Sequence, residues 1–217
     1  MKFKSYLWMV LAIIGILVFG SNLHADPVVH IDDPYGGRFN GGPFLIREMN
    51  LETFCLERGE TFVPGAAYYF TINSYAQGGG PGSINNMDPI DPRTAWLYLQ
   101  YLSNPGSYDL NHKIALQLAI WRIEDEFGVG FLNGYNGYEY LDPTILGYAT
   151  EYFIAANAAT RDPNILNNVF ALNLYGNTAH TNWRQSQLTV PEPSTLLLLG
   201  AGLIGLGILG RRKYRGV

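Results

Sequence analysis

Two long apolar runs stand near the ends of the chain, and shorter mixed patterns fill the residues between them. The first run, 6–19, follows Lys2 and Lys4 and precedes a polar stretch that ends at Ala25. This order of basic, apolar and polar segments is typical of a secretory signal peptide, so we expect export through the Sec machinery and cleavage after residues 1–25. An uncleaved anchor helix is the alternative interpretation.

The second apolar run, 195–210, is rich in Leu, Gly and Ile and is followed by a basic cluster that begins at Arg211 and Arg212. Its length is near the lower limit for a helix that spans a bilayer, so we expect a transmembrane helix there. Basic residues favour the cytoplasmic side, which leaves everything before Pro191 outside the cytoplasm. Both ends therefore predict a membrane anchor with the domain outside the cytoplasm, which in a Gram-negative cell means the inner membrane and the periplasm.

Between these runs the pattern changes from strands to helices and back. Segments rich in β-formers and bounded by Gly, Pro or Asn predict strands at 28–30, 44–49, 53–56, 66–74, 169–175 and 187–190. Asp-Pro pairs and apolar periodicity predict helices at 92–103, 111–127 and 143–159, with a short helix from 163. The Gly-rich stretch 77–86 predicts a loop. The fold class that follows is α+β, a single domain at 26–190 in which a β-barrel or sandwich-like sheet carries an inserted helical bundle.

The net charge of this domain restricts the classes of molecule that it can bind. Residues 26–190 contain 17 Asp and Glu against 8 Lys and Arg, a net charge of −9. Such a surface repels phosphate, which argues against nucleic acid as a partner. Aromatic residues are abundant and long Ser, Thr or Pro runs are absent from the sequence, so the segment is expected to be globular and not a stalk.

One polar residue interrupts the most apolar helix. Gln117 stands between Ile114 and Trp121, and at 100° per residue it points toward the face that these side chains bury. A buried carboxamide without hydrogen-bond partners costs on the order of 1–3 kcal/mol. We therefore expect another group to meet Gln117.

The only cysteine, Cys55, is the second anomaly. An exported protein meets an oxidising compartment, where a lone thiol cannot form an intramolecular disulfide. A single buried cysteine can act simply as a small hydrophobic residue. A thiolate can also attack the carboxamide of a glutamine and expel ammonia, and an internal thioester of this kind would account for Cys55 and Gln117 together.

At these residues the sequence resembles the bacterial thioester domains of surface adhesins. The family's aromatic-Cys-aliphatic-acidic motif is matched by Phe54, Cys55, Leu56 and Glu57, and its Gln-x-Ala-Ile-Trp helix motif by Gln117, Leu118, Ala119, Ile120 and Trp121. The resemblance implies that Cys55 is the thioester sulfur and Gln117 the acyl donor. It also implies covalent attachment to an amine-bearing surface or matrix target. A bond formed once per molecule makes the domain a single-use reagent and not an enzyme, with no cofactor.

Some positions near these motifs have two interpretations. Leu116 stands where the family has Thr. Trp121, one turn beyond Gln117, is a lid over the bond or an ordinary core residue. Lys113 and Glu124 lie near the direction of Gln117 and either tune the site or belong to solvated parts of the helix, whereas His112 faces elsewhere and is expected at the surface.

Two other function classes stay open. A structural or exopolysaccharide-binding module with a free Cys55 needs no thioester. A Cys-His hydrolase would pair Cys55 with His30, His112 or His180, since such partners need only be close in space. Asp32 and Asp33 beside Gly36 and Gly37 could suggest calcium, but their spacing favours a turn.

The carboxyl end carries the most specific motif. Pro191, Glu192 and Pro193, then the apolar run, then Arg211 and Arg212 closely resemble the PEP-CTERM sorting tail of Gram-negative bacteria over residues 191–217. The resemblance implies recognition by an exosortase, removal of the tail and a link to exopolysaccharide or biofilm material at the cell surface.

Overall fold

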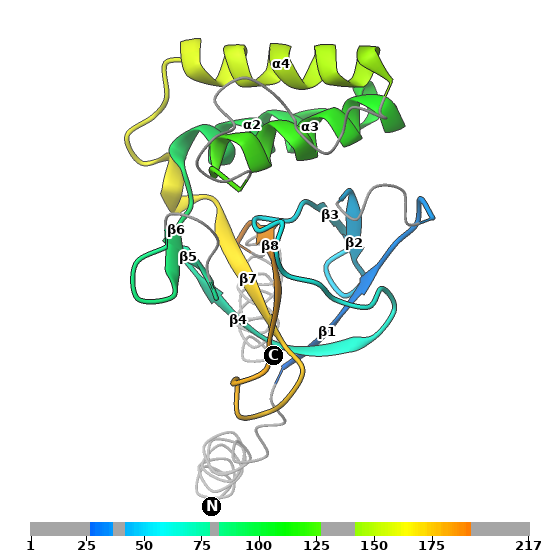
Figure 1. Cartoon of the computed structure of the whole chain (residues 1–217), viewed down its shortest axis with the longest axis vertical. Helices are drawn as coiled ribbons and strands as arrows, with labels where there is room; N and C mark the ends of the chain where they lie inside the picture. The colour runs from blue at the N-terminus through cyan, green and yellow to red at the C-terminus, as the bar shows by residue number, and fades with distance from the viewer. Residues whose placement is uncertain (1–26, 37–41, 79–82, 127–141, 192–217) are drawn as a thin grey trace, which may run out of the picture.

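The computed structural model describes residues 27–36, 42–78, 83–126 and 142–191 (Figure 1). Within these ranges no helix is both long enough and apolar enough to cross a membrane. The predicted signal peptide, the predicted transmembrane helix at 195–210 and the sorting residues Glu192, Pro193, Arg211 and Arg212 lie outside the described residues. Pro191 is the last described residue and is exposed.

Six strands form one antiparallel sheet in the order β3-β2-β1-β4-β7-β8. Their bounds are β1 Val28–Asp32, β2 Phe44–Ile46, β3 Leu51–Thr53, β4 Ala67–Asn73, β7 Phe170–Tyr175 and β8 Trp183–Thr189. The residues that follow β3 return to β8: Leu56 N–H donates to Ser186 O at 3.0 Å and Leu188 N–H donates to Phe54 O at 2.9 Å. The sheet therefore curls until its two ends meet through backbone hydrogen bonds.

A separate two-stranded ribbon, β5 Tyr75–Gln77 and β6 Met87–Pro89, connects the sheet to the helices. The helices are α2 Pro92–Ser103, α3 Leu110–Ile123 and α4 Pro143–Ala158. They stack over one end of the sheet, with α4 outermost and α2 and α3 between α4 and the strands (Figure 1). Each helix begins after an aspartate, Asp91, Asp109 or Asp142, whose side chain accepts a backbone N–H of the first turn.

The mixed α+β class with a separate helical layer is confirmed, and the strands form one curled sheet plus a ribbon. The bounds of α2 agree with the prediction, and α4 ends one residue earlier. The predicted loop 77–86 is bordered by β5 and β6, which the sequence did not predict. The short helix expected from 163 is a single 3-10 turn, Ile165–Asn167.

Several predicted bounds were wrong. The strand predicted at 44–49 ends at Ile46 and the one predicted at 53–56 is Leu51–Thr53, because residues 47–50 form a turn between them. Helix α3 ends at Ile123 and not at Phe127, because Asp125 adopts a left-handed conformation (φ 61°) and Glu126 N–H donates to Trp121 O at 2.9 Å. Strand β8 begins at Trp183 and not at Gln187. Its first half is polar and gave no strand signal, but pairing with β7 holds it in the sheet.

Candidate functional site

Cys55 and Gln117 meet between the sheet and the helical layer. Cys55 follows β3 and forms an isolated bridge with Gln187 of β8, whereas Gln117 lies on the face of α3 turned toward the sheet. Cys55 N–H donates to Gln117 Oε1 at 2.8 Å, and Gln117 Nε2 donates to Cys55 O at 2.8 Å. Cys55 is fully buried and Gln117 is 2% exposed. The polar residue of the apolar helix thus finds its partners on the main chain of the only cysteine.

A second backbone donor reaches the same carbonyl oxygen. Gly42 N–H donates to Gln117 Oε1 at 3.0 Å, so this oxygen accepts two main-chain N–H groups. Two fixed donors on one carbonyl oxygen polarise the carbon and stabilise the negative charge that develops when a nucleophile attacks it. Glycine is required here, because a Cβ at position 42 would lie 2.9 Å from Gln117 Oε1 and 3.0 Å from Thr53 O.

The thiol of Cys55 lies in a dry environment. Burial raises the pKa of the Cys55 thiol to about 12; hydrogen bonds from Gln187 and from Gly42 N–H oppose this rise, and the charge of Glu57 adds to it. Both polar atoms of the Gln117 carboxamide bond the main chain of Cys55, so the residue that bears the thiol is in direct contact with the carboxamide. The arrangement brings together a nucleophile, an acyl group and a pair of donors for the acyl oxygen.

Gln187, like Gly42, is a residue of this site that sequence reasoning missed. Its side chain is fully buried, its Nε2 donates to Cys55 Sγ at 3.4 Å, and its Oε1 lies 3.7 Å from the same sulfur. A carboxamide in a buried strand is only weak evidence for a functional residue. Nothing in the sequence links it to a cysteine 132 positions away, because only the curling of the sheet brings the two together.

The remaining motif residues belong to the core around the pair. Trp121, 1% exposed, packs in the same hydrophobic cluster as Cys55. A second cluster holds the other apolar motif positions and the residue that replaces the family's Thr: Phe54, Leu56, Leu116, Ala119 and Ile120. Glu57 is also buried, at 1% exposed. The structure therefore brings the two motifs together; the roles assigned to their residues remain predictions.

Lys113 and Glu124, the neighbours of Gln117 on α3, have other partners. Lys113 Nζ donates to both carboxylate oxygens of Glu52, at 2.9 and 2.8 Å. Burial lowers the pKa of Lys113, but its hydrogen bonds to Glu52 and Tyr35 outweigh this and raise it, so the amine stays protonated and is not an internal nucleophile. Glu124 accepts the N–H of Asp91 at the start of α2.

The histidines are engaged away from the thiol. His30 Nδ1 lies 2.6 Å from Glu48, His112 Nδ1 lies 2.8 Å from Asp109, and the His180 ring stacks on Tyr175 at 4.4 Å between centroids. Within the described part of the chain, no imidazole is among the hydrogen-bond partners of Cys55.

The acidic pair near the amino end forms a turn, as its spacing favours. Asp33 Oδ1 accepts the N–H groups of Tyr35 and Gly36, and Asp32 pairs with Arg47. Gly37 lies outside the described residues.

Comparisons with known proteins found a similar solved structure and a sorting motif. One solved structure, the N-terminal thioester domain of a protein F2-like fibronectin-binding protein from Streptococcus pneumoniae, is similar to this chain with a TM-score of 0.43 and 15% identity, covering 76% of this chain and 91% of that one. No curated protein matches. Residues 189–213 match the PEP-CTERM protein-sorting motif. This chain therefore carries at its carboxyl end the sorting signal of exported proteins that exosortase-type enzymes recognise at the membrane.

Proposed function

We propose that the exported domain forms an internal thioester between Cys55 Sγ and Gln117 Cδ and uses it for covalent attachment to amine-bearing surface or matrix targets. The observation that carries the proposal is the double hydrogen bond to Gln117 Oε1 from Gly42 N–H and Cys55 N–H. A glutamine that served only packing would need a partner, but not two main-chain donors converging on its carbonyl oxygen beside a thiol.

Formation of the bond is an acyl transfer within the chain. Cys55 Sγ attacks Gln117 Cδ, and the two N–H groups stabilise the oxyanion of the tetrahedral intermediate. The C–N bond then breaks, and the carboxamide nitrogen leaves as ammonia with the proton that the thiol gives up. Gln187 Nε2, 3.4 Å from the sulfur, positions the nucleophile.

Storage and use of the bond depend on burial. Cys55 and Gln117 are closed to solvent, and Trp121 is a buried member of the same cluster as Cys55, so water has little access to the acyl carbon. An amine that enters the site attacks the acyl carbon, forms an amide and releases the Cys55 thiol. Each molecule reacts once, so the domain is a covalent binder and not a catalyst. The exopolysaccharide or biofilm matrix at the cell surface is the setting that the sorting signal favours.

A second candidate keeps Cys55 as a free thiol in a matrix-binding module. Burial raises the pKa of this thiol to about 12, so it would be unreactive in the folded protein and safe in an oxidising compartment. The same sorting signal serves either function. The two candidates differ in one covalent bond, which makes mass the discriminating quantity.

The first prediction is a mass deficit. Exported protein purified without amines should be about 17 Da lighter than its encoded mass between the observed termini, the loss of one ammonia. Cys55→Ala and Gln117→Ala proteins, prepared in the same way, should show no deficit. Methylamine should then add to the wild-type protein alone, at Gln117, and expose one titratable thiol.

Three outcomes separate the candidates. Full mass together with one free thiol, found only on unfolding, supports the matrix-binding module and contradicts the thioester. A mass about 1 Da above the encoded value indicates a thioester that has hydrolysed, because water leaves a carboxylate at position 117. A deficit that methylamine never removes would mean a structural cross-link, and the adhesive function would then be rejected.

A further inference from the structure

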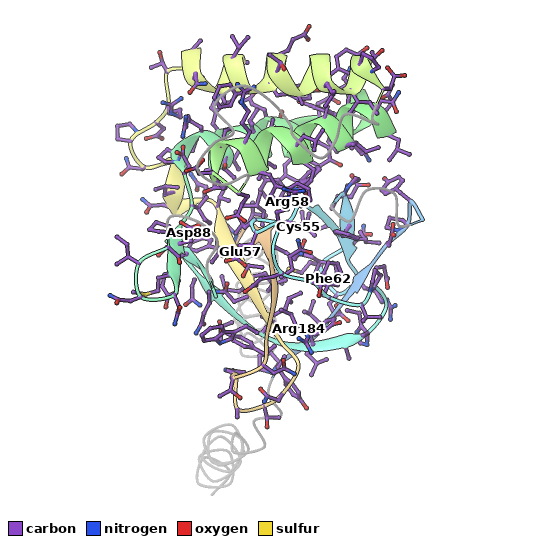
Figure 2. The ribbon with its side chains drawn as sticks, viewed as in Figure 1. Cys55, Glu57, Arg58, Phe62, Asp88 and Arg184 are labelled. Atoms are coloured by element: carbon purple, nitrogen blue, oxygen red, sulfur yellow. The ribbon has the colours of Figure 1, made fainter. Side chains whose placement is uncertain are left out.

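Four carboxyl groups near the candidate thioester act on one another in pairs: Glu57, Glu60, Asp88 and Glu126, named here the acidic cluster. Glu57 stands two residues after Cys55 on the segment that follows β3. The charge of Glu57 acts on the Cys55 thiol, and Glu57 and Glu60 are hydrogen-bonded through their side chains. Asp88, on β6, and Glu60 both act on the charge of Glu126. Figure 2 shows Cys55, Glu57 and Asp88 where the ribbon and sheet meet the helices.

Two members of the acidic cluster are buried, and two of its carboxylate oxygens lack a donor among the described residues. Glu57 is 1% exposed and Glu126 6%. Glu126 Oε2 accepts the N–H of Arg58 at 3.0 Å, but Glu126 Oε1 and Glu60 Oε2 have no hydrogen-bond partner among the described residues. Unpaired carboxylate oxygens that are withdrawn from water are costly, so a ligand that brings positive charge and N–H donors would be stabilised there.

The pKa values of Glu126 and Glu60 also favour a role for the acidic cluster in binding a cation and accepting a proton. Burial, with smaller contributions from the charges of Asp88, Glu60 and Asp125, raises the pKa of Glu126 to about 7, and the hydrogen bond from Arg58 N–H opposes this rise. Burial also raises the pKa of Glu60, although its hydrogen bond to Glu57 and the charge of Arg184 oppose the rise. A carboxyl group that titrates near neutral pH is suited to accept a proton during a reaction.

The geometry does not suit a metal ion, since no three His, Cys, Asp or Glu side chains of the described residues are arranged to hold one. An ammonium group carries three N–H donors and no acceptor, which matches oxygens that lack donors. We propose that the acidic cluster binds the protonated primary amine of the target, such as a lysine side chain, beside Cys55 and takes up the proton that the amine loses before it attacks. The attack step rests on the proposed function, whereas the ammonium site does not.

The reaction balances with the groups present. The bound ammonium gives one proton to a carboxylate of the acidic cluster, and the free nitrogen lone pair attacks Gln117 Cδ. The C–S bond breaks with its electron pair going to Cys55 Sγ, which takes a second proton from the nitrogen. The products are an amide at Gln117 and a thiol at Cys55. The site would therefore select primary ammonium groups over neutral nucleophiles such as sugar hydroxyls.

The second prediction compares a cationic with a neutral nucleophile. Reaction with methylamine, protonated at pH 7, and with hydroxylamine, neutral at pH 7, is followed by mass in wild-type, Glu60→Gln and Glu126→Gln proteins. Loss of one charge-assisted contact should slow methylamine about tenfold and leave hydroxylamine within about twofold. Glu151→Gln, an exposed change of the same chemistry on α4, is the control and should alter neither rate. Equal slowing of both reagents, or no slowing, would overturn the inference.

A binding measurement tests the ammonium site independently of whether the thioester forms. In Cys55→Ala protein, which forms no thioester, 1,4-diaminobutane is titrated by ligand-observed NMR, with circular dichroism confirming the fold of each variant. Binding should be seen, and it should weaken at least about fivefold when Glu126→Gln is added. Absence of binding rejects the ammonium site even if the thioester exists. Binding by a chain whose wild type has full mass would keep the ammonium site and reject the proposed function.

Discussion

Gly42 is the residue whose backbone holds the acyl oxygen, and its change is the third prediction. In Gly42→Ala protein the added methyl group would lie 2.9 Å from Gln117 Oε1 and 3.0 Å from a main-chain oxygen, so the carboxamide must move. Removing one donor from an oxyanion site typically costs about 100-fold or more in rate. We expect the mass deficit to form at least about 100-fold more slowly in this variant, measured by intact mass at intervals after synthesis.

Gly59→Ala is the matched control for that experiment, because no atom lies within 4 Å of a Cβ at position 59. It should form the bond at the wild-type rate. If Gly42→Ala protein shows the full deficit as fast as its control does, Gly42 N–H has no part in forming the bond.

Sequence reasoning could identify some of these residues and not others. Cys55 and Gln117 stood out because each violates a local expectation, a lone thiol in an exported chain and an amide on a buried helix face. Gly42 and Gln187 gave no such signal. The contribution of Gly42 is a main-chain N–H, which every residue but proline has, and Gln187 reaches the sulfur only because the sheet curls.

At the scale of elements, local capping chemistry was the reliable guide. Asp91 and Asp142 each precede a proline and accept a first-turn N–H, and the helices after them begin where predicted. The end of α3 is set by the left-handed Asp125, which the sequence did not mark, and the start of β8 depends on tertiary contacts. In β8, for example, buried Gln185 donates to Glu57 O and buried Ser186 donates to Asn173 Oδ1, pairings that no local pattern encodes.

The fourth prediction concerns how the stability of the fold depends on pH, and it rests on the contact between α3 and α2. Glu124, at the end of α3, accepts Asp91 N–H, and burial raises the pKa of its carboxyl group to about 8. The folded state therefore holds a proton that the unfolded state releases near pH 4.5. The free energy of unfolding should fall as pH rises from about 4.5 to 8. For one group this fall is at most about 1.4 kcal/mol per pH unit.

Denaturant titrations at pH 5, 6, 7 and 8 measure this slope. Glu126 acts in the same direction but only up to about pH 7. Between pH 7 and 8, Glu124→Gln should therefore flatten the slope, whereas Glu126→Gln should leave most of it. An unchanged slope in the Glu124→Gln protein would show that this carboxyl group does not titrate with folding.

For the molecule as a whole, the arrangement of layers explains why the site lies where it does. The helical layer covers the end of the curled sheet, and α3 turns its buried face toward the strands (Figure 1). Gln117 and Cys55 are thus held from opposite layers, 62 positions apart in the chain. The sequence predicted an α+β domain, but not this juxtaposition, because a contact between layers depends on how the connecting segments fold.

The last prediction is removal of the carboxyl-terminal tail, which the sorting signal implies and which would leave the fold intact. The motif spans 189–213, and β8 ends at Thr189, so a cut after residue 194 removes no residue of the sheet. Leu188 N–H still donates to Phe54 O, which keeps the pairing beside Cys55. Protein extracted from the host surface should therefore lack residues 195–217 and still carry the mass deficit, as shown by mass and carboxyl-terminal peptide analysis.

A variant with Ala at 191, 192 and 193 should keep residues 195–217 and stay in the membrane fraction. If wild-type surface protein retains the tail, the chain is held by a simple membrane anchor, and exosortase processing is rejected without touching the chemistry of Cys55 and Gln117.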